Sequence, residues 1–91
     1  MYSLQKGSKA TRTLYVHTAE RLNCSVDGNP QYRIYFCYKK DSTLSNFSAV
    51  TDANAGWVYR LPDVLDLKGK QCNVVIHRPR VNLYIDEMEL V

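Results

Sequence analysis

Apolar and polar residues alternate with a period of two over most of the chain, which is the pattern of β-strands with one buried face. In residues 71–77, for example, Cys72, Val74 and Ile76 fall on one face, and Asn73, Val75 and His77 fall on the other. Val, Ile and Tyr are frequent in these stretches and favour strands. We therefore expect strands over residues 12–18, 22–26, 31–38, 47–50, 71–77 and 81–86.

The clearest local prediction is a β-hairpin centred on Asp27-Gly28-Asn29-Pro30. Alternating apolar residues flank this segment on both sides. Asp-Gly supplies the positive backbone φ of a tight turn, and proline fixes the exit of the chain. The hairpin should therefore pair residues 22–26 with residues 31–38.

The pattern changes from period two to a helical period after Val50. Ala53, Trp57 and Leu61 lie on one face of a helix that Thr51 is placed to cap and Pro62 to end. A helix this short is marginal alone, so Trp57 should be buried against the sheet.

The alternation also breaks near the end of the chain. Apolar residues hold the odd positions from 81 to 85 and then the even positions 88 and 90. One extra residue in a strand, or the end of the strand, produces this shift, so we expect a β-bulge or a strand end near Asp86 and Glu87.

These elements predict an α+β domain that is mainly β. We expect five to six strands, with one short helix, in a bent antiparallel sheet or a small, partly open barrel of the OB or SH3 type. Residues 1–11 are polar and are interpreted as a flexible arm, and residues 12–91 as a single domain.

Composition limits the class of protein without choosing a function. The 91 residues fit one hydrophobic core, and the net charge is +3. Residues 1–40 hold seven Lys or Arg against two acids, whereas residues 41–91 hold five against seven. This asymmetry is too weak to indicate nucleic-acid binding by itself.

The three cysteines, Cys24, Cys37 and Cys72, all fall within apolar strand patterns and show no metal-ligand spacing. We interpret them as reduced core residues. The chain opens without the apolar run of a secretion signal and contains no stretch long enough to span a membrane. The sequence therefore favours the cytoplasm and no membrane partner.

Candidate catalytic groups do not form a known constellation. His17 and His77 lie in strand patterns, no nucleophile motif accompanies them, and no phosphate-binding glycine loop is present. We therefore expect a binding protein that is not an enzyme and needs no metal or other cofactor.

Single-stranded nucleic acid is one candidate ligand. Arg33, Tyr35 and Lys39 share one face of the strand over residues 31–38. Basic and aromatic side chains interleaved on one sheet face are how OB-folds stack single-stranded bases. Exposed cross-strand tyrosine pairs that only stabilise the sheet would give the same pattern.

The candidate function that the sequence favours comes from a family resemblance, and nucleic-acid binding is its alternative. Residues 21–32 read RLNCSVDGNPQY, which resembles an S-V-x-G-N-P-x-Y motif of small uncharacterised bacteriophage and prophage accessory proteins. Residues 51–59 and 68–75 are similar to the segments that follow the motif in those proteins. The resemblance implies a phage-borne protein, in the manner of anti-CRISPR proteins that occlude a nuclease of the host.

On this second reading, the protein inhibits a host defence complex in the host cytoplasm by binding to it, without chemistry. The acidic end of the chain suits a basic partner such as a nucleic-acid-binding nuclease. The candidate contacts comprise two aromatic anchors, Tyr35 and Tyr84, and four charged residues, Arg78, Arg80, Asp86 and Glu87.

Overall fold

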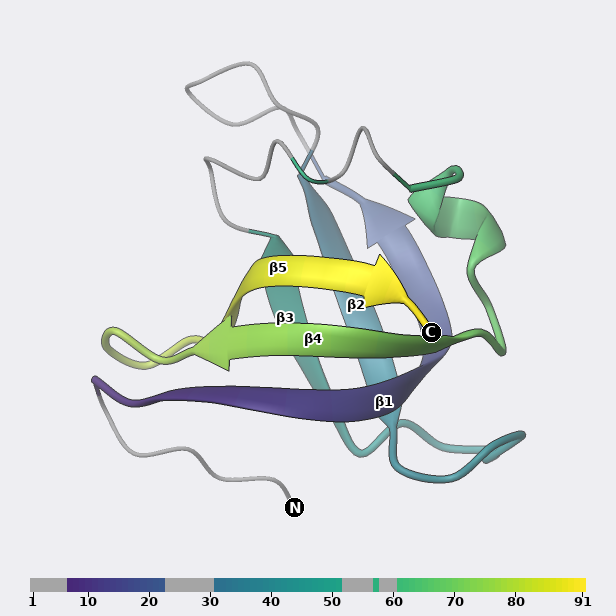
Figure 1. The fold of residues 1–91 in the computed structure, drawn as a ribbon, viewed down its shortest axis with the longest axis horizontal. Helices are drawn as coiled ribbons and strands as arrows, with labels where there is room; N and C mark the ends of the chain where they lie inside the picture. The colour runs from purple at the N-terminus through teal and green to yellow at the C-terminus, as the bar shows by residue number, and fades with distance from the viewer. Residues whose placement is uncertain (1–6, 23–30, 52–56, 58–60) are drawn as a thin grey trace.

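The computed structural model describes residues 7–22, 31–51, 57 and 61–91 of the chain, and five β-strands account for most of them (Figure 1). The strands are β1 (Lys9–Arg21), β2 (Tyr32–Cys37), β3 (Phe47–Thr51), β4 (Gln71–His77) and β5 (Tyr84–Leu90). A 3-10 turn, η2 (Val64–Asp66), precedes β4.

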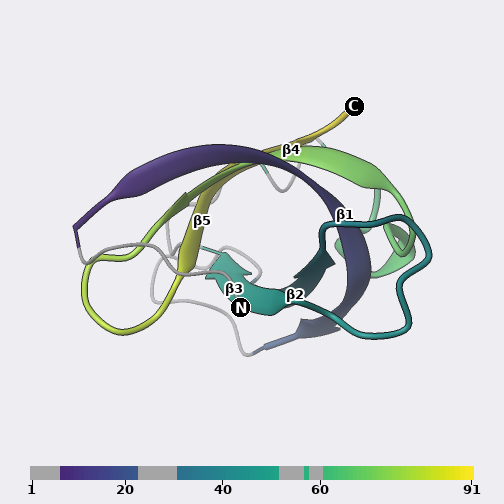
Figure 2. The same ribbon diagram turned by 90° about the horizontal axis from the view of Figure 1, so that it is seen from below.

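The long strand β1 closes the sheet into a barrel because it pairs with two neighbours. Residues 9–15 of β1 pair antiparallel with β4, and residues 15–21 pair antiparallel with β2. The strands follow the order β1-β2-β3-β5-β4 around the ring, which Figure 2 shows from below. The prediction of a mainly β fold that curves into a small barrel is confirmed.

The strand order distinguishes between the two expected barrel types. β3 and β5 run parallel, through the pairs Val50–Tyr84 and Thr51–Ile85, and β5 lies between β3 and β4. A simple meander would keep the strands in chain order, whereas this exchange is a Greek-key connection. The topology is therefore that of an OB-like barrel.

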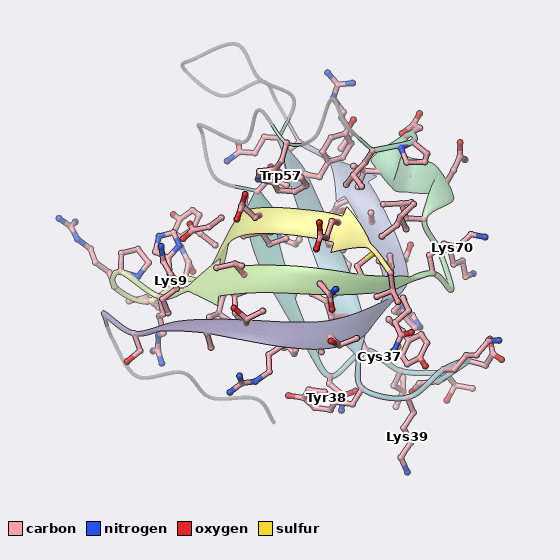
Figure 3. The ribbon with its side chains drawn as sticks, in the orientation of Figure 1. Lys9, Cys37, Tyr38, Lys39, Trp57 and Lys70 are labelled. Atoms are coloured by element: carbon pink, nitrogen blue, oxygen red, sulfur yellow. The ribbon has the colours of Figure 1, made fainter. Side chains whose placement is uncertain are left out.

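Inward-facing residues of all five strands form one core. The largest fully buried side chains include Phe36, Leu14, Ile34, Ile76 and Ile85. Each such side chain contributes about 1.5–3 kcal/mol by leaving water. Trp57, Val64 and Leu67, from the segment between β3 and β4, belong to the same core. Figure 3 places Trp57 at the upper end of the barrel, and its predicted burial is confirmed.

Within the described residues, the strand that pairs with β2 ahead of the predicted turn is the second half of β1. β1 pairs with β2 from Tyr15–Cys37 to Arg21–Tyr32, with a register shift between Val16 and Thr18, and the Leu22 amide donates to the Gln31 carbonyl at 2.8 Å. The paired strand therefore reaches back to residue 15, further than the predicted arm. The predicted turn at residues 27–30 and most of the predicted strand over residues 22–26 lie outside the described residues.

The predicted strand ends were wrong at two places. β1 begins at Lys9, inside the predicted arm, because residues 9–11 complete the ladder with β4. The last strand begins at Tyr84, since Val81 lies exposed in the β4–β5 loop. The predicted bulge is confirmed: Val75 faces Glu87 and Ile76 faces Ile85, which leaves Asp86 as the extra residue.

Most of the predicted helix over residues 51–61 lies outside the described residues. Thr51, its expected cap, is the last residue of β3. Its hydroxyl accepts a hydrogen bond from the Tyr32 amide at 2.9 Å. This bond crosses from β2 to β3, so the hydroxyl ties two strands together.

The buried thiols agree with the sequence analysis where they are described. Cys37 and Cys72 are free and buried, whereas Cys24 lies outside the described residues. In the part of the chain that the structure describes, no helix is long and apolar enough to cross a membrane.

Candidate nucleic-acid interface

Five outward-facing residues, one from each strand, line up at one level of the barrel. Strand pairing places Lys9 opposite His77, His77 opposite Tyr84, Tyr84 opposite Val50, and Val50 opposite Arg33. Directly paired residues share a face of the sheet, and none of the five is buried. These residues, from β1, β4, β5, β3 and β2, are called the transverse row below.

The centre of the transverse row is a pair of stacked rings. The His77 and Tyr84 rings have centroids 5.7 Å apart and an interplanar angle of 29°. Both residues are half-buried, so the sheet supports the pair and leaves part of it accessible. Supported aromatic rings of this kind offer a platform for another flat ring.

Asp86 neutralises one end of the transverse row. One of its carboxylate oxygens lies 2.5 Å from His77 Nδ1, and the other lies 2.9 Å from Lys9 Nζ. The hydrogen bond and the attraction between Lys9 and Asp86 raise the pKa of Lys9. Asp86 reaches both partners because the bulge turns its side chain out of the regular alternation.

Glu20 has the same effect at the other end. Arg33 Nη1 lies 2.9 Å from Glu20 Oε1, and the Tyr35 hydroxyl donates to the same oxygen at 3.3 Å. The hydrogen bond with Glu20 is the main reason that the pKa of Arg33 is raised. The sequence analysis predicted Arg33 and Tyr35 as neighbours but missed Glu20, because only the β1–β2 register reveals it.

The β4–β5 loop, residues 78–83, borders the row and is fixed at both ends. The Arg78 amide donates to the Ser8 carbonyl at 3.2 Å, and the Val50 amide donates to the Leu83 carbonyl at 3.1 Å. Within the loop, Arg78 Nε donates to the Val81 carbonyl at 3.1 Å. These bonds hold the loop in one conformation beside His77 and Tyr84.

A cavity of about 650 Å³ lies between this loop and the row. Its walls carry rings, side-chain amides and one guanidinium. The lining residues are Gln31, His77, Pro79, Arg80, Val81, Asn82 and Tyr84.

The predicted contact residues separate into two groups. Tyr84, Arg78, Arg80 and Asp86 lie in or beside the transverse row. Lys39 follows β2, and Figure 3 places it at the opposite end of the molecule from Lys9. Lys39 therefore does not share a site with the row, although alternation predicted that it would share a face with Arg33.

Glu87 and Tyr35 lie away from the centre of the row. Glu87 faces Val75 further along β5 and is exposed. Tyr35 faces Ser48, one outward position below Arg33 and Val50. The two predicted aromatic anchors, Tyr35 and Tyr84, are thus on different levels of the barrel.

The two histidines have different surroundings. His17 lies at a second bulge, in β1, and its Nε2 is 3.2 Å from the Thr43 carbonyl. His77, by contrast, is central to the row, which the sequence analysis did not recognise. Within the described ranges, no cluster of three or more His, Cys, Asp or Glu residues is arranged to hold a metal ion.

Topology and surface together define the class: a small OB-like barrel with an aromatic and basic row across its strands. No family model matches the chain, and no curated protein or solved structure matches it either.

Proposed function

We propose that the protein binds single-stranded nucleic acid across the transverse row. The observation that carries this proposal is the alignment of the stacked His77–Tyr84 pair between cationic residues, Lys9 on one side and Arg33 on the other. Bases stack on the rings of such a surface while cations follow the phosphates.

The fold supports the same surface by analogy. OB barrels bind oligonucleotides on the face of strands 2 and 3 and with the loops between strands 1 and 2 and between strands 4 and 5. Here the row crosses β2 and β3, and its centre lies beside the β4–β5 loop. Fold alone does not establish function, so the argument depends on the side chains in the row.

Binding on this surface should be weak to moderate and sensitive to salt. Lys9 and Arg33 are paired with carboxylates, and Arg80 adds an exposed guanidinium beside the cavity. If these three cations contact phosphates, the logarithm of affinity should fall with the logarithm of salt concentration with a slope of about −2.

Fluorescence anisotropy with labelled single-stranded oligonucleotides of about 12 nucleotides, a length within the site size of one OB fold, tests the proposal. Tyr84→Ala should weaken binding about tenfold, because stacking one base contributes about 1–3 kcal/mol. Tyr38→Ala is the matched control, since Tyr38 lies near Lys39 at the opposite end (Figure 3). Absence of binding, or equal losses in both variants, would contradict the proposal.

The second candidate is the inhibitor function predicted from the family resemblance. One observation favours it: Glu87 and Glu89 are exposed on β5, away from the row's aromatic centre, and suit a basic protein partner. In this proposal the protein occludes a host defence protein in the cytoplasm and catalyses nothing. Recovery of a defence protein with the chain from host lysate, and protection of phage on defended hosts, would support it.

A further inference from the structure

We infer that the cavity beside the β4–β5 loop receives one nucleobase and selects adenine over thymine. This inference rests on the proposed function and adds specificity to it. It depends on the cavity's aromatic wall, its side-chain amides and its fixed loop.

The aromatic wall suits a flat, uncharged ring. Tyr84 and His77 contribute stacked rings, and Pro79 adds an apolar surface from the loop. The volume of about 650 Å³ falls within the range of small-molecule sites. A purine offers more surface for stacking than a pyrimidine, so this wall favours adenine or guanine.

The amides favour a base that carries an amino group. Gln31 Nε2 donates to the Thr51 carbonyl at 3.5 Å, which leaves Gln31 Oε1 to accept a hydrogen bond. In the described part of the chain, no hydrogen bond engages the Asn82 side chain, which therefore retains a donor and an acceptor. An Asn or Gln amide pairs with the amino group and N7 of adenine, whereas thymine has no exocyclic amine to donate.

The position of the cavity links the base to the strand bound on the row. His77 and Tyr84 belong to both surfaces, so a strand that follows the row passes the cavity opening. Arg80 lies on the cavity wall and is exposed, which places a cation where a phosphate of the same nucleotide would lie. Because hydrogen bonds fix the loop at both ends, little ordering accompanies binding.

The test compares two oligonucleotides of about 12 nucleotides, oligothymidylate and the same strand with one central adenine. By anisotropy, the adenine-containing strand should bind at least about fivefold more tightly, the discrimination that one good amide pair provides. Asn82→Ala should reduce the preference to the part that purine stacking contributes, and it should retain affinity for oligothymidylate. Asn73→Ala is the matched control, because Asn73 bonds Thr13 on β1 and does not line the cavity.

The outcomes separate the two levels of the proposal. Equal affinities for the two strands, or a preference that is undiminished in Asn82→Ala, would overturn base selection, while oligothymidylate binding would leave the proposed function standing. Failure to bind either strand would overturn both. As a second measurement, adenosine monophosphate should shift the amide resonances of residues 80–82 more than thymidine monophosphate does, and equal shifts would also overturn the inference.

Discussion

Thr51 shows how one polar side chain stabilises the barrel. The residue is 0% exposed, and its hydroxyl satisfies the buried amide of Tyr32 on the neighbouring strand. Thr51→Val keeps the shape and removes the acceptor. The free energy of unfolding should fall by about 1–3 kcal/mol, because a buried donor loses its partner.

Urea denaturation followed by Trp57 fluorescence measures this loss. Thr13→Val is the control, since the Thr13 hydroxyl donates to Asn73 on the exposed surface, and it should change stability by less than about 1 kcal/mol. Equal losses of unfolding free energy in the two variants would show that the buried Thr51 hydrogen bond stabilises the fold no more than the exposed Thr13 hydrogen bond does.

The buried thiol of Cys72 should make the free energy of unfolding depend on pH. The thiol is 0% exposed, and burial raises the pKa of Cys72 to about 11 from an ordinary value of 9.0. Above pH 9 the unfolded chain loses this proton before the folded chain does, and this ionisation stabilises the unfolded state. The free energy of unfolding therefore falls as the pH rises to about 11.

The comparison with Cys72→Ala isolates this thiol from the tyrosines and lysines that titrate in the same range. The wild type should be more stable below pH 9, because the substitution leaves a cavity, and its advantage should shrink between pH 9 and 11. A difference in unfolding free energy that stays constant over that interval would contradict the assignment.

At this scale the sequence identified the residues better than their roles. Trp57, Cys37 and Cys72 were correctly predicted to be buried. Thr51 was interpreted only as a helix cap, a role that involves residues outside the described part of the chain, and its hydrogen bond between strands was not predicted. Its partner, Tyr32, is 19 residues away, and local pattern carries no information about such a contact.

The bulge in β5 is the element that controls charge in the transverse row. It positions the Asp86 carboxylate between Lys9 and His77, where it repels a phosphate. Asp86→Asn should therefore strengthen binding of single-stranded DNA about two- to fivefold at low salt, since one unit charge at contact distance is worth about 1 kcal/mol in water.

Glu89→Gln, on the same strand but opposite Asn73, is the matched control for this substitution and should have a smaller effect. The measurement is anisotropy at two salt concentrations, because the gain should diminish as salt screens the charge. Weaker DNA binding by Asp86→Asn would contradict the proposed role of the row. If the chain instead binds a basic protein, Asp86→Asn should weaken that complex.

At the scale of the elements, the sequence predicted the features that the alternation of apolar and polar residues encodes. The bulge was predictable because one extra residue changes which positions are apolar. The start of β5 was not, since Val81 and Leu83 continue the apolar alternation although they lie in a loop. The double pairing of β1 was also missed, because a strand that bends between two partners looks like any long strand.

At the scale of the whole molecule, Trp57 and residues 61–70, between β3 and β4, extend the core at one end of the barrel. Trp57 is 5% exposed and packs in the core with Val64 and Leu67. Trp57→Ala should lower the free energy of unfolding by about 3–5 kcal/mol through lost burial and the cavity left behind. That loss is most of the stability expected for a domain of this size.

Circular dichroism during thermal unfolding measures this effect without depending on tryptophan emission. Leu65→Ala is the control from the same segment, because Leu65 is 47% exposed and its removal should be nearly neutral. A small effect of Trp57→Ala would mean that the barrel closes without this segment.

The transverse row itself exists only at this scale. Arg33 and Tyr84 were both candidates from the sequence, but 50 positions separate them. Val50 on β3 connects them, because it pairs with Arg33 on β2 and, in parallel, with Tyr84 on β5. No local pattern predicts that contact. Lys9 and His77 were missed for the same reason, because only barrel closure brings β1 beside β4.

Nuclear magnetic resonance of the isotope-labelled chain, titrated with oligothymidylate, tests the central claim most directly. Binding across the row should shift the amide resonances of Lys9, Arg33, Val50, His77 and Tyr84 together, with one saturation curve. Residues 38–46, in the loop between β2 and β3, should remain unchanged. Shifts concentrated in that loop, or a spectrum unaffected by the oligonucleotide at low salt, would contradict the account.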